Sequence, residues 1–505
     1  MEPPMTCVAV IDIGKTNKKL CCFDERLELL DQVSAAFPTL PGEHGLLYED
    51  VEGIWAWYQE QLPALYRRHP FSAIAVTTHG ATYALLDAQG ALAHPVVAYD
   101  SPLDGPAQRR LDEAFYQRCG PLRELQVETG TCDLPLLINS AKSLLYLQQL
   151  APERLAKAAT LLWYPQYWSY CLTGALGAEV TYTANHSFLF DIQRRCPSSV
   201  ARALGVESLL RLPLGRPGDH LGNLHPDLQQ RWGLPEMPVA VGIHDSNAAL
   251  LPYLLKHPNR DFVLNSTGTW CVAMHRVPQA LYREEELEQK IIFNIDALGQ
   301  LHKTSFLMGG QDYALYAGMI GGNDPGFDQT RVDGHLAELG NAILPGAHPS
   351  QFPGMHGGAS GHKGESRISW SLEELSGGGP EWLRQPEKAY DYLNASLAIQ
   401  TTVALARTDM QAQSTVFVEG GFRNNSTYVA LLAALLPEAS VVLTDLSQAT
   451  AAGTALLALD LVVDADLRSL ASHLEIQEHH VPAPRLEHLA AYSEDYLRLA
   501  RPSQR

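Results

Sequence analysis

Short apolar runs alternate with amphipathic stretches from the start of the chain. Residues 8–13 are apolar and β-branched, residues 14–17 are turn-forming, and residues 19–23 return to the strand pattern. Residues 49–66 have the apolar spacing of a helix, and residues 72–77 have the pattern of a buried strand. This alternation of strands and helices favours an α/β fold with mixed sheets.

A second unit of strand, turn and strand occurs midway along the chain. Residues 261–264 and 270–274 are apolar, and the polar turn 265–269 between them carries glycine and threonine. Because a chain of 505 residues is too long for one hydrophobic core, we expect two domains, over residues 1–255 and 256–505. A hairpin that opens each half suggests a duplicated architecture.

The pattern predicts five further elements and one loop. They are strands over 237–242 and 415–419, helices over 246–255, 425–436 and 449–458, and an exposed loop over 354–379. In the last helix, Ala452, Gly453 and Ala455 are small enough to permit close packing against a neighbour.

The composition is that of a well-folded soluble protein, with 46% hydrophobic and 18% charged residues. A formal net charge of -19 removes the electrostatic basis for binding nucleic acid or an anionic membrane, although a helix N-terminus could still bind a small anion. No apolar run of about 18 residues exists, so we expect no transmembrane helix. The N-terminal residues lack the basic and apolar regions of a signal peptide, which favours the cytoplasm.

Eight cysteines are scattered along the chain, and no two have the spacing of a zinc or redox pair. Cys21 and Cys22 are adjacent in a predicted strand, where they would point to opposite faces. We expect buried, reduced thiols, which also fits the cytoplasm.

The first turn resembles a P-loop but lacks two of its features. A P-loop needs a glycine five residues before its Gly-Lys pair, where this chain has Ala9, and it needs a helix to follow. Backbone N–H groups and the side chains of Lys15, Thr16 and Asn17 could nevertheless hold phosphate oxygens, and Asp12 could orient Mg²⁺ through its water shell. An ordinary β-hairpin with a solvated lysine is the alternative.

The turn over residues 265–269 is a second candidate for a phosphate contact. Alone it is as weak a signal as the first turn. Two such turns, each opening one half of the chain, would let a nucleotide be clamped between two related domains.

His244 and Asp245 lie where a predicted strand ends and a predicted helix begins. A carboxylate at such a place, beside a cleft, can accept a proton from an attacking hydroxyl. Aspartate at a helix start also fits a plain N-cap, so the residues alone leave both interpretations open.

Two further places carry candidate binding residues. Gly420 and Gly421 lie between a strand and a helix, where the absence of side chains would let a flat base approach the backbone, or where a tight turn needs positive φ. His79 and Asp100 end strand-like runs in the first half, where a polyol could be hydrogen-bonded. A lone histidine of this kind is more often structural than a ligand.

Nine segments, in their order along the chain, resemble the FGGY family of carbohydrate kinases. They are IDIGKTNKK, THGATYALLD, AYDSPLDGP, ETGTCDLPLLINSAKSLLYL, YPQYWSYCLTGALGAEVTYTANHSFLFD, GIHDSNAALL, LNSTGTW, VEGGFRNNS and ATAAGTALLA. The resemblance implies two actin-like (RNase H-like) ATPase domains with a nucleotide and sugar cleft between them.

The resemblance also implies a role for each matching residue. Asp245 matches the catalytic base and Asp12 the acid that assists the metal. The positions that match ATP-binding residues are Gly14, Lys15, Thr16, Asn17, Gly268, Thr269, Gly310, Gly420, Gly421 and Asn424. The positions that match sugar-binding residues are His79, Asp100, His244 and Asp245.

The chain departs from the family pattern at three places near these residues. Lys15 stands where the family usually has Thr or Ser, Thr77-Thr78 replace Gln-Met, and Tyr99 replaces Trp. These departures indicate a divergent subgroup that resembles rhamnulokinase and L-fuculokinase-type enzymes.

The resemblance therefore predicts an enzyme that uses ATP and Mg²⁺ to phosphorylate a sugar hydroxyl, with a ketose or deoxyketose such as L-rhamnulose or L-fuculose as substrate. A kinase of a pentulose or polyol (xylulose, ribulose or glycerol type) is the alternative, followed by a non-catalytic sugar-sensing protein of the same fold and by an actin-like ATPase. The expected partners are a small sugar and ATP, with no nucleic acid or membrane, and a homodimer is left open.

Overall fold

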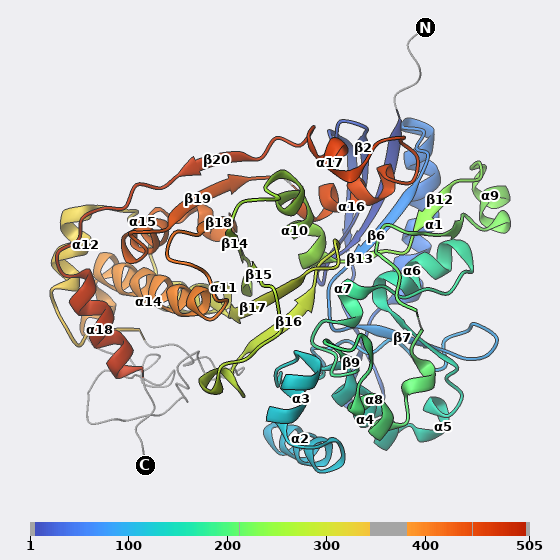
Figure 1. The fold of residues 1–505 in the computed structure, drawn as a ribbon, viewed down its shortest axis with the longest axis horizontal. Coiled ribbons are helices and arrows are strands. Elements are labelled where there is room, and N and C mark those ends of the chain that lie inside the picture. Colours follow the sequence, from blue (N-terminus) through green and yellow to red (C-terminus); the bar gives the residue numbers. More distant parts are fainter. Residues whose placement is uncertain (1–5, 212, 344–380, 447, 501–505) are drawn as a thin grey trace, which may run out of the picture.

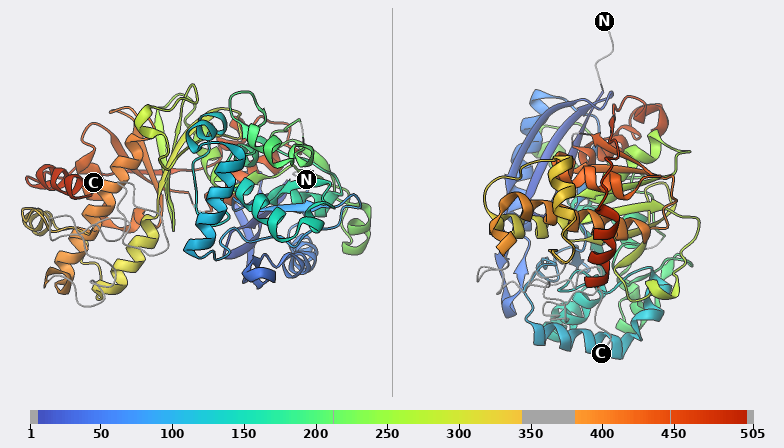
Figure 2. Two further views of the ribbon diagram at one scale, coloured as in Figure 1. Left: turned by 90° about the horizontal axis from the view of Figure 1, so that it is seen from below. Right: turned by 90° about the vertical axis from the view of Figure 1, so that its left-hand side faces the viewer.

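The computed structural model describes residues 6–211, 213–343, 381–446 and 448–500, and in it the protein has two halves, each built around one mixed β-sheet (Figure 1). Figure 2 shows the second half, yellow to red, beside the first, blue to green. The loop predicted over residues 354–379 lies outside the described residues.

The first sheet has the strand order β11-β12-β6-β1-β2-β3, and β13 also pairs with β6. Its strands are β1 (Cys7–Ile13), β2 (Asn17–Asp24), β3 (Leu29–Ala36), β6 (Ile74–Thr78), β11 (His220–Asn223), β12 (Pro238–Ala240) and β13 (Ile243–His244). β1, β2 and β3 are antiparallel neighbours, whereas β6 is parallel to β1, β12 and β13. The predicted hairpin over residues 8–23 is therefore confirmed as β1 and β2.

The second sheet has the order β16-β17-β15-β14-β18-β19-β20. Its strands are β14 (Phe262–Thr267), β15 (Cys271–Arg276), β16 (Ile291–Ile295), β17 (Leu301–Leu307), β18 (Thr415–Gly420), β19 (Ser440–Asp445) and β20 (Gln477–His480). From β17 to β20, strand order and directions repeat those of the first sheet from β3 to β11. This repetition is the duplication that the two hairpins predict.

The remaining short strands form two-stranded pairs outside the two large sheets. They are β4 (Leu40–Pro41), β5 (Leu47–Tyr48), β7 (Tyr83–Leu86), β8 (Thr160–Trp163), β9 (Phe190–Asp191) and β10 (Cys196–Pro197).

Helices cover the faces of both sheets, and several form the lower part of the first half in Figure 1. The helices of the first half are α1 (Val51–Arg68), α2 (Gly105–Cys119), α3 (Leu122–Thr129), α4 (Ser140–Leu150), α5 (Pro152–Leu155), α6 (Tyr164–Thr173), α7 (Val180–Thr183), α8 (Ser199–Leu204), α9 (Pro226–Trp232) and α10 (Asp245–Lys256). Those described in the second half are α11 (Gly309–Ile320), α12 (Gln329–Leu336), α14 (Pro386–Ala406), α15 (Ser426–Leu435), α16 (Ala449–Leu459), α17 (Leu467–Ala471) and α18 (Leu489–Leu499). Short 3₁₀ turns lie at Glu43–Gly45, Glu207–Leu209, Glu284–Glu286, Glu381–Arg384 and Gly421–Asn424.

The two faces of the first sheet belong to different cores, and the adjacent cysteines show this. Cys22 packs in the cluster that contains Tyr58 of α1, whereas Cys21 packs in the cluster that contains Ala455 of α16. Successive residues of a strand point to opposite faces, as predicted for this pair. All eight cysteines are free thiols.

Helices α10 and α16 join the two halves because each packs against the sheet of the other half. α10 follows the first sheet but packs Leu250 and Tyr253 against the second, while α16 follows the second sheet and packs Ala455 and Leu456 against the first. The two helices meet at Gly453, where an added Cβ would lie 1.9 Å from the carbonyl oxygen of Ala248. The close packing predicted from the small residues of this helix is confirmed.

Two boundaries differ from the sequence-based expectation. Residues 265–267, predicted as turn, continue strand β14 because they pair with β15 and β18, so the turn itself is Gly268 to Trp270. The N-cap of α10 is His244, whose side chain accepts a hydrogen bond from the N–H of Ser246, and Asp245 is the first helical residue. In the part of the chain that the structure describes, no helix combines the length and the apolar character that crossing a bilayer requires.

Candidate active site

Three strands of the first sheet end at the same edge and bring the polar residues of that edge together. Asp12 of β1 and Ile243 of β13 both pair with Thr77 of β6, which lies between them. His79 follows β6 and donates its backbone N–H to the carbonyl oxygen of Ile13 at 2.9 Å. Parallel strands therefore place Asp12, His79 and Asp245 side by side, although they are far apart in sequence.

The carboxylates of Asp12 and Asp245 share one electrostatic environment. Burial raises the pKa of Asp12 to about 6, the charge of Asp245 adds to that rise, and Lys19, whose ammonium is 3.6 Å away, opposes it. Burial likewise raises the pKa of Asp245, against the stabilising hydrogen bond from the N–H of Ser246 at 2.6 Å. Two carboxylates with raised pKa values favour a proton or a cation between them.

A buried lysine, Lys18, supports the first turn through two hydrogen bonds. Lys18 is fully buried, and its Nζ donates to the carbonyl oxygens of Gly14 at 3.0 Å and Lys15 at 2.9 Å. Since the N–H of a trans peptide points opposite to its C=O, the N–H groups of Lys15 and Thr16 point away from Lys18. Thr16 and Asn17 are exposed, so this side of the turn is open to an anion. Sequence analysis missed this role of Lys18.

The side chain of Lys15 turns toward carboxylates of the first half. Its Nζ lies 2.7 Å from Oε1 of Glu49, 2.8 Å from Oδ1 of Asp100 and 4.9 Å from the ring centroid of Tyr99. Glu49 is buried, whereas the side chain of Asp100 is 42% exposed. The structure therefore joins two predicted residues, Lys15 and Asp100, through an ion pair that the sequence did not indicate.

Three histidines surround Gly80 beside Asp245. A Cβ added to Gly80 would lie 2.5 Å from Nε2 of His244 and 2.8 Å from Nε2 of His186. Burial lowers the pKa of both His186 and His244 to about 3 and also lowers that of His79, so all three are neutral near pH 7. Neutral imidazoles can both donate and accept hydrogen bonds.

Several polar atoms at this place have no partner in the described structure. They include Nε2 of His79, Nδ1 of His186 and Oδ1 of Asn185. Buried polar atoms are normally paired, so these atoms fit the hydroxyl groups of a bound ligand. His186 also has a φ of 33°, and non-glycine residues in that region cluster at functional sites. Asn185 and His186 were not predicted, because nothing in the sequence reports their backbone conformation.

The second turn is held by glycines that touch its backbone. A Cβ on Gly310 would lie 2.0 Å from the carbonyl oxygen of Gly268, and a Cβ on Gly420 would lie 2.1 Å from that of Thr267. Gly420 has a φ of +83°, so it needs both the space and the conformation that glycine provides. The N–H of Gln311 adds a 3.3 Å hydrogen bond to the carbonyl oxygen of Thr269.

The other predicted nucleotide residues lie at the exposed end of β18. Gly421 and Asn424 are exposed, and Asn425, the N-cap of α15, donates from its side chain to Asn394 at 2.8 Å. The structure brings Gly268, Gly310 and Gly420 into one cluster in the second half. The residues of the first half form another cluster, and Lys19 links it to α16 through a 2.9 Å hydrogen bond to Gln448.

The positions of Asp12 and Asp245 also bear on whether the site could hold a metal ion. Nowhere in the described ranges do three or more His, Cys, Asp or Glu side chains form a group that could hold a metal ion. Mg²⁺ commonly binds through one or two carboxylates, with water and ligand phosphates completing its shell. The buried carboxylate of Asp12, whose pKa is raised, fits such a magnesium site.

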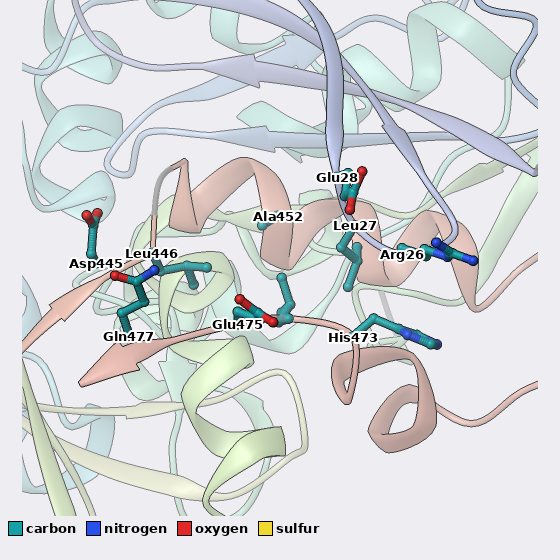
Figure 3. Close-up of a pocket in the computed structure, with 10 residues that line it drawn as sticks. Arg26, Leu27, Glu28, Asp445, Leu446, Ala452, His473, Glu475 and Gln477 are labelled. Atoms are coloured by element: carbon teal, nitrogen blue, oxygen red, sulfur yellow. The ribbon is translucent and has the colours of Figure 1, made fainter.

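A pocket of about 440 Å³ lies apart from this site, where the β2–β3 turn of the first half meets α16 and the segment before β20 (Figure 3). Arg26, Glu28, His473, Glu475 and Gln477 line it with charged and polar groups. None of the predicted site residues is among its described lining residues.

Comparison with known proteins extends over both halves. Residues 7–252 match the model of the FGGY family of carbohydrate kinases, N-terminal domain, and residues 259–466 match the model of the carbohydrate kinase FGGY C-terminal domain. Together the matched ranges cover most of the chain.

Individual relatives are distant. The chain is 26% identical to L-fuculokinase of Salmonella typhi over 289 residues, which are 54% of this chain and 57% of that protein. It is 27% identical to rhamnulokinase of Bacteroides thetaiotaomicron over 266 residues, 52% of this chain and 53% of that protein. The chain thus spans little more than half the length of these two curated relatives. The crystal structure of a carbohydrate kinase from Novosphingobium aromaticivorans is 27% identical, with a TM-score of 0.76, and the match covers 98% of this chain and 100% of that one.

Proposed function

Since the chain belongs to the FGGY family of carbohydrate kinases, we propose that it transfers the γ-phosphoryl group of ATP to a hydroxyl of a sugar. The observation that carries this proposal is the position of Asp245. Its carboxylate lies at the start of α10, within electrostatic reach of Asp12 and next to a group of neutral histidines.

In the proposed reaction, Asp245 accepts the proton of the sugar hydroxyl as the hydroxyl oxygen attacks the γ-phosphate in line. Backbone N–H groups of the two turns, at Lys15 and Thr16 in the first half and at Thr269 in the second, stabilise the phosphate oxygens, while the N–H of Gly268 closes the second turn onto the carbonyl oxygen of Trp270. Asp12 would hold Mg²⁺, and the metal would supply positive charge to the phosphates when it is bound. Gly420, Gly421 and Asn424 would form the adenosine side.

The proposed substrate is a ketose or deoxyketose such as L-rhamnulose or L-fuculose. Two relatives support this class, because they are described as L-fuculokinase and rhamnulokinase. His79, His186 and His244 would donate to and accept from its hydroxyls, together with Asp100. We also propose that the protein works in the cytoplasm, which its eight free cysteines fit.

The test is a coupled assay of ADP release over a panel of ketoses, pentuloses, aldoses and polyols, with the wild-type protein and Asp245→Asn. We expect turnover with a deoxyketose and a fall in kcat of about 10²-fold or more in the variant, the scale of losing general-base catalysis, with little change in the KM for ATP. Asp227→Asn is the matched control, since Asp227 also lies in the first turn of a helix, α9, but is exposed and outside the site.

The outcomes separate the alternatives. Unchanged turnover in Asp245→Asn would leave Asp245 with only a structural role at the helix start. Turnover confined to pentuloses or glycerol would replace the substrate class and keep the reaction. ATP hydrolysis that no sugar stimulates would indicate an ATPase, and no turnover at all with intact sugar binding would indicate a sensing protein.

A further inference from the structure

The backbone of Lys15 is part of the first turn, whereas its side chain reaches the two segments that carry Glu49 and Asp100. Its Nζ contacts Glu49 at 2.7 Å and Asp100 at 2.8 Å, and it lies over the ring of Tyr99. An ammonium with two carboxylates within 3 Å has its charge neutralised where it stands. Moving it to a phosphate would break both ion pairs and leave the buried carboxylate of Glu49 without this partner.

The phosphate side of the turn does not depend on the Lys15 side chain. Lys18 already holds the carbonyl oxygens of Gly14 and Lys15, at 3.0 and 2.9 Å, and this fixes the direction of the N–H groups that face away from it. Burial lowers the pKa of Lys18, and the nearby charges of Glu49 and Asp100 oppose that fall. The positive charges of Lys15 and Lys18 are thus balanced by the negative charges of Glu49 and Asp100.

Backbone hydrogen bonds connect the two segments that carry Glu49 and Asp100. The N–H of Glu49 donates to the carbonyl oxygen of Val96 at 2.8 Å, and the N–H of Ala98 donates to that of Leu47 at 2.9 Å. The hydroxyl of Ser101 donates to Ala98 at 2.8 Å and accepts from the N–H of Leu47 at 3.0 Å. The Asp100 carboxylate is 42% exposed and is held by its ion pair with Lys15.

We infer that Lys15 is a positioning residue for the sugar: it holds Oδ1 of Asp100 so that the other carboxylate oxygen faces a sugar hydroxyl, and its ammonium does not contribute to nucleotide binding. This inference rests on the proposed function, because it assigns Asp100 to a sugar. Covering Asp100 with a ligand removes water from a carboxylate, and a fixed ammonium beside it offsets that loss. Lys15 thereby favours a ligand that donates a hydrogen bond at this position, as a hydroxyl does.

The experiment measures sugar and nucleotide binding separately by calorimetry, using L-fuculose, L-rhamnulose, D-xylulose and glycerol without nucleotide, and ADP with Mg²⁺ without sugar. In Lys15→Met we expect sugar affinity to fall about tenfold, the scale of losing one charge-assisted hydrogen bond, while ADP affinity changes by less than about twofold. Lys15→Arg should recover most of the sugar affinity, because it restores the cation. Lys157→Met, which removes an exposed lysine, is the control for the loss of one positive charge.

A double variant identifies the partner through which Lys15 acts. Lys15→Met combined with Asp100→Asn should bind sugar no more weakly than Asp100→Asn alone, since the two changes remove one shared interaction. If Lys15→Met fails to fold, as thermal unfolding would reveal, Asp100→Asn and Lys15→Arg still test the same assignment through their separate effects on sugar and ADP.

Three results would overturn the inference. Lys15→Met could weaken ADP binding as much as sugar binding, it could leave the binding of a sugar that the wild type binds unchanged, or its effect could add fully to that of Asp100→Asn. A wild-type protein that binds ADP but no sugar of the panel would instead overturn the proposed function and this inference with it.

Discussion

The turn between β1 and β2 and the turn between β14 and β15 occupy equivalent places in two sheets of the same topology, yet they are held in different ways. A buried ammonium, that of Lys18, fixes the first turn through its carbonyl oxygens. Two glycines, Gly310 and Gly420, fix the second by direct contact with its backbone, and no charged side chain takes part in those contacts.

The difference shows what a duplicated topology does and does not impose. Strand order and direction place each turn at the carboxyl edge of its sheet, beside a parallel strand. The means of support depends on local residues, and a charge and a close backbone contact serve equally well. The two halves can therefore keep one architecture with little residue identity between them.

The second turn should be the more sensitive to a single methyl group. Gly310→Ala would bring a Cβ within 2.0 Å of the carbonyl oxygen of Gly268, so either helix α11 or the turn must move. We expect kcat/KM for ATP to fall by about 10²-fold, the effect of misplacing reacting groups by roughly 1 Å. Overpacking should also lower the free energy of unfolding by about 1–3 kcal/mol.

Gly318→Ala on the same helix is the control for that prediction. Apart from the neighbouring backbone of α11 itself, no atom of the described residues lies within 4 Å of its added Cβ. Alanine there should raise stability by up to about 1 kcal/mol through helix propensity and leave ATP kinetics unchanged. Equal behaviour of the two variants would show that the glycine contact is not what supports the second turn.

The first turn should respond to the loss of a charge. Lys18→Met retains the bulk of the side chain but leaves the carbonyl oxygens of Gly14 and Lys15 without their donor. We expect the KM for ATP to rise about tenfold and the free energy of unfolding to fall by about 1–3 kcal/mol, the cost of unsatisfied buried polar groups. Steady-state kinetics and urea unfolding measure the two effects, with Lys157→Met as control. Normal ATP kinetics in Lys18→Met would mean that the hairpin alone sets the turn.

Each turn has a buried carboxylate near it, and the pKa values of these two carboxylates are raised to different extents. Lys19 partly offsets the burial of Asp12, whereas burial alone raises the pKa of Asp312, in α11, from 3.8 to about 7. Between these two pH values the unfolded chain has lost the Asp312 proton and the folded chain keeps it, so stability falls as pH rises and levels off above about 7.

The expected effect is the smallest of the three. From pH 6 to pH 8 Asp312 should lower the free energy of unfolding by about 1.4 kcal/mol, and Asp312→Asn should remove that decline. Urea unfolding of both proteins at several pH values gives the difference. A difference that does not vary with pH would mean that Asp312 has an ordinary pKa.

Much of the fold could be predicted from the sequence because it depends on the pattern of neighbouring residues. The apolar runs around the first turn, the small residues of α16 and the helix after His244 all report their structure within a few positions. The partners of Lys15 could not be predicted in this way. Glu49 and Asp100 reach it through the folding of separate loops, and that information is spread over 86 residues of chain.

The histidine group illustrates a second limit. His79 follows β6 and His244 ends β13, so both could be picked from the sequence, whereas His186 lies in a loop whose positive φ has no sequence signal without glycine. The sequence suggests Asp245 as one possible N-cap of α10, whereas the cap is His244. Aspartate is the commoner cap, but where the strand ends decides which residue takes the position.

The crossing of α10 and α16 has a mechanical consequence. Because backbone meets backbone at Gly453 and Ala248, no side chain separates the two helices at that point, and the crossing can act as a pivot between the halves. Ala248 lies about one helical turn beyond Asp245. Points near a pivot travel least, so a swivel at this crossing would carry the second turn through a wide arc while the carboxylate of Asp245 stays almost still.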